Sequence, residues 1–172
     1  ANMSKRAGTI MTAKEVLDVV GKDAVRFFIL ERDVNSYIDF DLDLAREKSS
    51  KNPVYYVQYA HARICSILAK VEGKINLDAD FSLLSTEYEL DLIKQITRLP
   101  ELVEDISQSF AVHHLTTYAK DLADSFHRFY ENCRVVGEEK KLMEARVGLL
   151  KASQIALQNT LKLLGISAPE KM

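Results

Sequence analysis

The stretch PVYYVQYAHARICSILAKVEG, residues 53–73, contains the most regular hydrophobic pattern in the chain. Its apolar residues recur every three or four positions, the spacing that places side chains on one face of an α-helix. Pro53 suits a first helical turn, where its missing N–H would have no partner, and Gly73 suits an end. The pattern predicts a helix over 53–73, and its apolar stripe consists of Val57, Ala60, Ile64, Leu68 and Val71.

The other segments show the same spacing, and few Gly or Pro residues interrupt it. Helix starts are predicted at Thr12 and Thr86, because each is followed three residues later by a Glu that can complete a capping box. Pro100 predicts a break or kink, and Gly165 predicts the end of the last helix. Further helices are expected over residues 23–32, 101–108, 115–133 and 142–164. The chain is therefore predicted to be an all-α helical bundle.

Residues 37–44 differ, because apolar residues alternate there with aspartates. A period of two ordinarily predicts a β-strand, but the sequence offers no second strand to pair with it. We therefore expect an extended connector over 37–44. The chain turns polar over 49–52, just before the regular helix, and we place a domain boundary there. Residues 1–50 then form an appendage, and residues 51–172 form the bundle.

Composition narrows the function only slightly. The 172 residues are 47% hydrophobic, which is enough for one ordinary domain. A formal net charge of −2 argues mildly against a duplex-binding domain, although a single-stranded loop needs only a local basic patch. Cys65 and Cys133 lack zinc-type spacing, so we expect free thiols and no metal site. No apolar run reaches the length of a membrane span and the start lacks a secretory signal, which predicts a cytoplasmic protein.

Motifs of an autonomous active site are absent from the sequence: it has no P-loop, no dinucleotide fingerprint, no HExxH and no nucleophile elbow. The neighbours His113 and His114 would point about 100° apart on a helix, so they cannot chelate one ion from one face. The run MSKRAGT over residues 3–9 is harder to explain as the start of a folded domain. It has the character of a functional loop rather than of a helix.

Five segments together carry a resemblance to a known family. MSKR at 3–6, followed by GKDAVR at 21–26, resembles the signature loop and the following helix start of class I aminoacyl-tRNA synthetases. NPVYYVQYAHAR at 52–63 closely resembles the start of the anticodon-binding domain of arginyl-tRNA synthetases. FHRFYENCRV at 126–135 and LLGISAPEKM at 163–172 agree with that family in order, so the resemblance covers essentially the whole chain.

This resemblance implies the C-terminal part of an arginyl-tRNA synthetase. Residues 1–50 would end the catalytic region, where Met3, Ser4, Lys5 and Arg6 form the loop that closes on ATP. Lys5 would neutralise the ATP phosphates as charge develops. Asn2 and Arg6 depart from the family signature, which often has Lys and Ser there. Since the nucleotide-binding domain is missing from this sequence, we expect a monomeric fragment that binds tRNA(Arg) but no cofactor and does not aminoacylate. The parent enzyme would use arginine and ATP with Mg.

Helical geometry suggests which residues meet the RNA. Tyr56, Ala60 and Arg63 fall within about 60° of one another on a helical projection, beside the apolar stripe. A ring, a small gap and a cation are what an unstacked base needs. Tyr130 offers a second ring, and Arg134 lies one turn further along. The resemblance implies anticodon contacts by Tyr56, Ala60, Tyr130 and Met172, and geometry adds Arg63 and Arg134.

Three alternatives remain open from the sequence. Tyr56 and Tyr59 could simply pack at the edge of the core with their hydroxyls in water. The bundle could be a helical adaptor that accepts a partner helix and binds no nucleic acid, which the acidic net charge and the Leu-rich last helix would suit. A related class I enzyme, for cysteine or methionine, shares the GKDAVR-type element but not the 52–63 or C-terminal segments.

Overall fold

The computed structural model describes residues 11–71 and 78–172. Within those ranges every regular element is a helix, so the prediction of an all-α fold is confirmed. The predicted ATP-loop residues Met3, Ser4, Lys5 and Arg6 lie outside the described residues. The elements are α1 (Ala13–Val20), α2 (Lys22–Leu30), α3 (Leu42–Arg46), α4 (Pro53–Leu68), the 3₁₀ turn η2 (Phe81–Leu83), α5 (Glu87–Thr97), α6 (Leu99–Ser109), α7 (His113–Asn132) and α8 (Lys140–Leu164).

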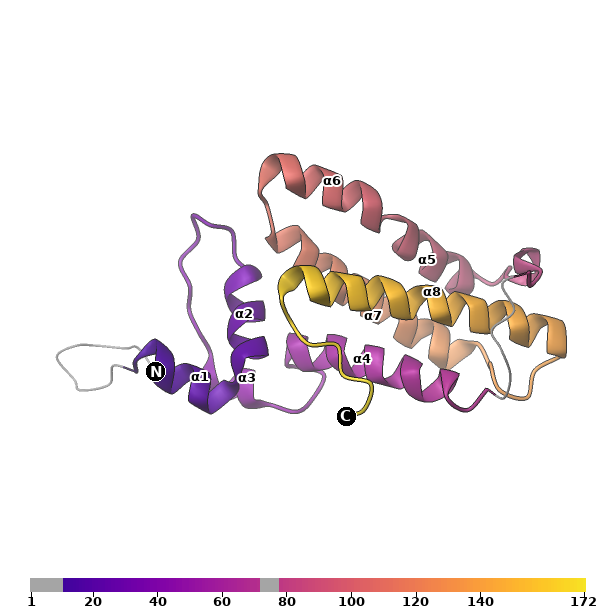
Figure 1. The fold of residues 1–172 in the computed structure, drawn as a ribbon, viewed down its shortest axis with the longest axis horizontal. Coiled ribbons are helices and arrows are strands. Elements are labelled where there is room, and N and C mark those ends of the chain that lie inside the picture. Colours follow the sequence, from indigo (N-terminus) through magenta and orange to yellow (C-terminus); the bar gives the residue numbers. More distant parts are fainter. Residues whose placement is uncertain (1–10, 72–77) are drawn as a thin grey trace.

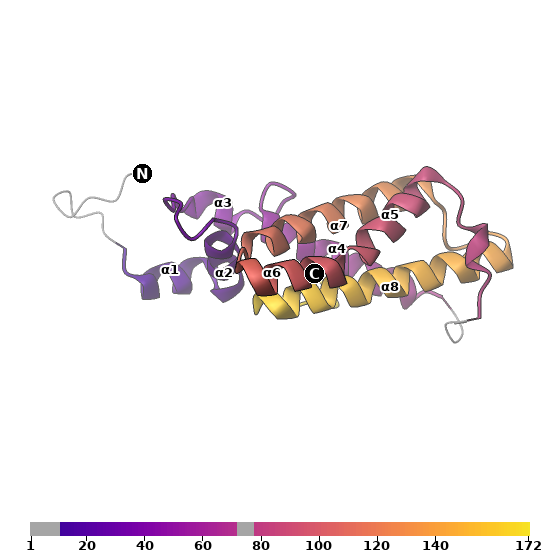
Figure 2. The same cartoon turned by 90° about the horizontal axis from the view of Figure 1, so that it is seen from above.

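Three long helices, α4, α7 and α8, lie alongside one another and form the body of an elongated bundle (Figures 1 and 2). The short helices α1, α2 and α3 gather at one end of it, and α5 and α6 pack along α7. The core between the long helices is fully buried and includes Val57, Ile64, Leu122, Phe126 and Leu157. None of the described helices is long and apolar enough to cross a membrane.

Helix starts agree with the capping signals. Thr12 and Thr86 both form the predicted capping boxes, and Gly165 ends α8 in the left-handed region with φ +68°. The helix predicted over 53–73 is shorter than expected. It ends at Leu68, because the next two turns are tightened into i→i+3 hydrogen bonds, Lys70 N to Ile67 O and Val71 N to Leu68 O.

The expectation of an extended connector over 37–44 is partly wrong, because its last residues belong to α3. The side chain of Asp41 accepts hydrogen bonds from the backbone N–H groups of Asp43 and Leu44, both at 3.0 Å. An aspartate in this role is a helix N-cap, which stabilises the first turn. Asp41 therefore starts a helix inside the segment that the alternating pattern predicts as an extended connector.

Asn52 fixes the start of α4. Its side-chain oxygen accepts from Val54 N at 3.2 Å, and its amide donates to the carbonyl oxygens of Ala45 and Glu47 at 3.1 and 2.9 Å. The residue is buried, and all three bonds satisfy polar groups that water cannot reach. Asn52 thus ties the end of α3 to the beginning of α4 and sets where the first tyrosines of α4 emerge.

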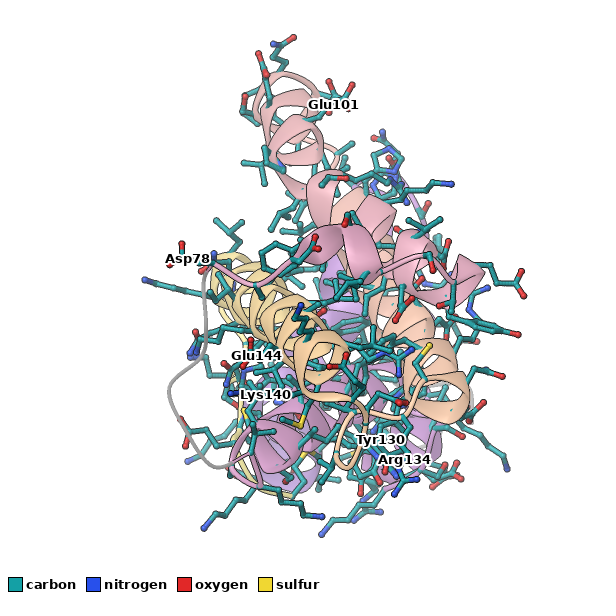
Figure 3. All side chains as sticks on the ribbon, turned by 90° about the vertical axis from the view of Figure 1, so that its right-hand side faces the viewer. Asp78, Glu101, Tyr130, Arg134, Lys140 and Glu144 are labelled. Carbon is teal, nitrogen blue, oxygen red and sulfur yellow. The ribbon has the colours of Figure 1, made fainter. Side chains whose placement is uncertain are left out.

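A buried ion pair joins α5 to α8 and reaches the end of α7. Arg146 Nε donates to Glu89 Oε1 at 2.7 Å, and its guanidinium also donates to the carbonyl oxygen of Arg134. The other oxygen of Glu89 accepts from Ser85 N, Thr86 N and the Thr86 hydroxyl. Figure 3 views the bundle from the end that carries Tyr130 and Arg134 and shows Glu101, on α6, on the opposite side. The ion pair of Glu89 with Arg146 therefore anchors the segment that follows Tyr130, because Arg146 also binds the carbonyl oxygen of Arg134.

Candidate nucleic-acid interface

Aromatic and cationic side chains from α4 and α7 meet on one surface of the bundle. On α4 they recur at positions 55, 56, 59 and 63, a spacing that places them on one side of the helix. On α7 they are three residues apart, within one helical turn. This surface, which we call the tyrosine face, consists of Tyr55, Tyr56, Tyr59, Arg63, His127 and Tyr130.

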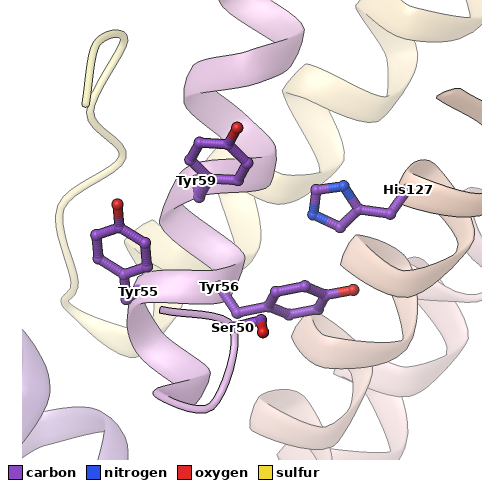
Figure 4. A pocket seen from close by; sticks show the side chains of 5 residues that line it. All are labelled: Ser50, Tyr55, Tyr56, Tyr59 and His127. Atoms are coloured by element: carbon purple, nitrogen blue, oxygen red, sulfur yellow. The ribbon is translucent and has the colours of Figure 1, made fainter. Parts of the chain in front are cut away.

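Three rings of the tyrosine face are close to parallel. The ring centroids of Tyr55 and Tyr59 are 6.2 Å apart with an interplanar angle of 10°, and those of Tyr59 and His127 are 6.1 Å apart at 20°. In Figure 4 the imidazole of His127 points from α7 toward the tyrosines of α4. Partly exposed, nearly parallel rings offer flat surfaces on which unstacked bases can lie.

Arg63 joins the two helices at the other end of this surface. Its Nη1 atom donates to the Tyr59 hydroxyl at 2.7 Å, and its Cζ atom lies 4.1 Å from the ring centroid of Tyr130, a cation–π distance. The guanidinium lowers the pKa of the Tyr130 hydroxyl, and contact with Tyr130 raises the pKa of Arg63. Arg63 therefore stays charged and holds Tyr59 and Tyr130 in a fixed relation.

Tyr56 contacts α7 through both its hydroxyl and its ring. Its hydroxyl donates to Asp124 Oδ1 at 2.5 Å, and its ring centroid lies 4.8 Å from that of His127. Burial, followed by the hydrogen bond to Asp124, raises the pKa of Tyr56 well above its usual value of 10.0. Tyr56 thus packs α4 against α7, and its hydroxyl already has a partner.

A pocket of about 320 Å³ opens within the tyrosine face. It is lined by Ser50, Tyr55, Tyr56, Tyr59 and His127, which Figure 4 shows around a common space. The volume is at the small end of the range for ligand pockets. Its walls are chiefly aromatic, which suits a flat ring better than a charged or flexible group.

His127 has an unusual environment. Among the described residues, its Nε2 atom is buried and has no hydrogen-bond partner. Burial, followed by the charge of Arg63, lowers the pKa of His127, although Asp124 and Glu131 act in the opposite direction. The imidazole is therefore neutral at pH 7 and keeps a polar atom that the folded chain leaves unsatisfied.

Replacing His127 with phenylalanine should keep the ring contacts and remove the unsatisfied nitrogen. We expect the variant to gain about 1 kcal/mol in the free energy of unfolding at pH 7. The gain should grow below the ordinary pKa of 6.5, because the unfolded chain then takes up a proton that folded His127, with its lowered pKa, refuses. Urea unfolding of both proteins between about pH 7 and about pH 5 measures this difference. A difference that does not change with pH would contradict it.

The structure brings together three of the residues predicted to contact RNA: Tyr56, Arg63 and Tyr130. Ala60 is different, because its side chain is fully buried. The expectation that Ala60 leaves a gap on the surface is therefore wrong, because the packing of other elements on α4 covers this position. Tyr130 is 39% exposed, so it is available as a stacking surface.

Arg134 and Met172 belong to the segments that follow α7 and α8. Arg134 follows the end of α7, and its Nε atom donates to Val136 O at 3.1 Å, so its side chain folds toward its own turn. Met172 is 54% exposed and ends a segment that runs back across α4 after α8 (Figure 1). Side-chain contacts through His127 and Tyr59 thus join Tyr56, Arg63 and Tyr130 into one surface, whereas the convergence of Arg134 and Met172 with them stays a prediction.

Sequence reasoning missed two members of the tyrosine face, Tyr55 and His127, and it considered Tyr59 only as a core-edge residue. A signal for Tyr55 was present, because Tyr55, Tyr59 and Arg63 are spaced by four residues and share one helical face. No comparable signal existed for His127. Its role depends on how α7 packs against α4, which residue spacing within one helix does not specify.

Comparisons with known proteins agree with one another. The sequence profile of the DALR anticodon binding domain matches residues 57–172. The arginine–tRNA ligase of Dehalococcoides mccartyi is 51% identical over 173 residues, and that of Geobacter metallireducens is 50% identical over 175 residues. Each alignment covers 99% of this chain, which spans 31% of the length of either ligase.

Solved structures give the same picture. A Campylobacter jejuni protein assigned to the arginyl-tRNA synthetases matches 98% of this chain with a TM-score of 0.87 and 31% identity, and the match covers 37% of that protein. The arginyl-tRNA synthetase of Thermus thermophilus matches 98% of this chain with a TM-score of 0.77 and 32% identity, over 29% of its own length. The helical bundle is thus similar in three dimensions to part of these larger proteins.

Proposed function

Because the chain belongs to the DALR anticodon-binding domain family, we propose that it binds the anticodon loop of an arginine tRNA as part of an arginine–tRNA ligase. The observation that carries the proposal is the tyrosine face, where rings from two helices surround a small aromatic pocket beside a fixed guanidinium. Proteins that read single-stranded RNA loops stack the bases on aromatic rings and hold the backbone with local cations. A formal net charge of −2 is compatible with this mode, because the basic group that matters is local.

The same proposal extends to the parent enzyme. Such a ligase would activate arginine with ATP and Mg and pass it to the tRNA in the cytoplasm. Residues 1–50 would end its catalytic region, and Lys5, in the loop formed with Met3, Ser4 and Arg6, would meet the ATP phosphates. Residues 51–172 would form the anticodon-binding bundle. The isolated chain would act as a monomer that binds tRNA(Arg) and forms no arginyl adenylate.

Fluorescence anisotropy with labelled anticodon stem-loop RNAs tests the proposal. The chain should bind the stem-loop of an arginine tRNA more tightly than one in which only the anticodon bases belong to another amino acid. Equal affinity for both RNAs would show that the chain binds RNA without reading the anticodon. No binding to either RNA would favour a helical adaptor that binds a protein partner. Circular dichroism of the same sample verifies that the protein is folded.

A further inference from the structure

The GKDAVR motif at 21–26 contacts the other end of the chain. Asp23 and Arg26, two charged residues of this motif, both lie on α2. Asp23 Oδ2 accepts from the hydroxyl of Ser167 and from Ser167 N, and Arg26 Nε donates to Leu164 O at 2.9 Å. The segment that follows α8, residues 165–172, is called the C-terminal tail below. Contacts from α2 therefore fix the point where this tail leaves α8.

Gly165 allows this close approach. It has φ +68°, which favours glycine, and a Cβ atom at this position would lie only 2.7 Å from a guanidinium nitrogen of Arg26. The turn from α8 into the tail is thus fitted around Arg26. Because the carbonyl oxygen of Leu164 is at the end of α8, the guanidinium also satisfies a group that the helix itself leaves without a partner.

The tail is then held along α4. Gln58 Nε2 donates to Ser167 O at 3.0 Å and also to Asp23 Oδ2 at 2.9 Å, so one amide joins α2, α4 and the tail. Further on, His61 Nδ1 lies 2.9 Å from Pro169 O. The tail is therefore fixed at positions 167 and 169, shortly before it ends at Met172.

This path borders the tyrosine face. Gln58 directly precedes Tyr59, so their side chains point about 100° apart around α4. α7 contacts α4 on the other flank, through Tyr56 and Asp124. The outward surface of α4, with Tyr55 and Tyr59, therefore lies between α7 and the tail, and Figure 4 shows this arrangement.

We infer that Asp23 and Arg26 are positioning residues for RNA binding: they fix the C-terminal tail so that its last residues form one edge of the tyrosine face. The inference rests on the proposed function and adds determinants from a helix that does not contribute to that face. A tail that is already fixed in place loses less conformational freedom when RNA binds. Asp23 thus acts through the tail and not by contact with RNA.

A double-mutant cycle in the 172-residue chain tests this inference. Asp23→Ala should weaken binding of the arginine anticodon stem-loop by about three- to tenfold, the range that corresponds to the net free energy of one ordinary hydrogen bond. A chain ending at Glu170 should show a similar loss. In that shortened chain Asp23→Ala should add little further, because the residues it positions are gone. The exposed Asp18 on α1 provides the control, and Asp18→Ala should change the RNA affinity of neither the 172-residue chain nor the shortened chain.

Hydrogen exchange supplies a readout that does not depend on RNA. The amide of Ser167 should exchange faster in Asp23→Ala, with α4 and α7 unchanged. If Asp23→Ala fails to fold, Ser167→Ala removes only the hydroxyl contact on the tail and should act in the same direction. Unchanged exchange, or losses that add fully in the cycle, would overturn the inference. Unchanged RNA affinity in Asp23→Ala, together with a large loss in Tyr59→Ala, would overturn it and leave the proposed function intact.

Discussion

Replacing Glu89 with alanine should lower the free energy of unfolding by about 3–5 kcal/mol, because buried Arg146 then keeps only the partly exposed Glu138, 3.3 Å away, as a carboxylate partner. The Glu89 side chain is 1% exposed and that of Arg146 is 8% exposed, so water cannot take the place of the lost carboxylate. The same change removes the Glu89 half of the capping box at the start of α5, whereas the Thr86 hydroxyl can still accept from the backbone N–H of residue 89. Urea unfolding monitored by circular dichroism measures the loss. Lys51→Ala, which breaks an exposed ion pair with Glu47, is the control and should have almost no effect.

Glu89 should also determine part of the acid sensitivity of the fold. Burial alone would raise its pKa, but hydrogen bonds from Arg146 and Thr86 outweigh burial and lower it. Its contribution is therefore complete above the ordinary value of 4.5 and is lost as the pH falls through the lower folded pKa. A Glu89→Ala protein that is as stable as wild type would show that this pair does not hold α5, α8 and the end of α7 together.

Replacing Tyr59 or Tyr130 with alanine should weaken binding of the arginine anticodon stem-loop by about 1–3 kcal/mol each, the usual value of one base stacked on a ring. Because Arg63 contacts both rings, the two losses should not add fully. Anisotropy titration of the single and double variants measures this coupling.

Two variants control for other causes. Tyr59→Phe keeps the ring and loses only the hydroxyl that meets Arg63, so it should retain most of the affinity. Tyr37 is 100% exposed and lies between α2 and α3, so Tyr37→Ala should have no effect. Full affinity in both Tyr59→Ala and Tyr130→Ala would mean that the bases lie elsewhere. A loss that accompanies unfolding would instead assign the tyrosines a packing role.

Most of the fold could be predicted from the sequence, because local signals decide where helices begin and end. The capping boxes at Thr12 and Thr86 and the glycine at 165 act within a few residues of chain, and the structure confirms them. Two elements differ from the prediction: α4 ends early, at Leu68, and α3 begins where Asp41 caps a short helix inside an alternating pattern. At that point the N-cap signal of Asp41 predicts a helix and the alternation of apolar residues predicts extended chain, and the structure follows the N-cap signal.

The candidate site was less predictable, because it depends on contacts between helices. A helical projection places Tyr56 and Arg63 on the correct side of α4, but it also predicts Ala60 at the surface, whereas packing between the helices buries it. The pairing of His127 with Tyr56 and Tyr59 follows from the packing of α7 on α4. The same holds for the contact of Asp23 with Ser167, which joins residues 144 positions apart.

The central claim is that the tyrosine face stacks unpaired anticodon bases, and abasic substitution tests it most directly. The chain would be titrated with an arginine anticodon stem-loop and with the same RNA whose anticodon nucleotides lack their bases but keep the backbone. We predict at least about tenfold weaker binding of the abasic RNA, and a Tyr59→Ala, Tyr130→Ala protein that barely distinguishes the two RNAs. Equal affinity of the unaltered chain for both RNAs would contradict the account.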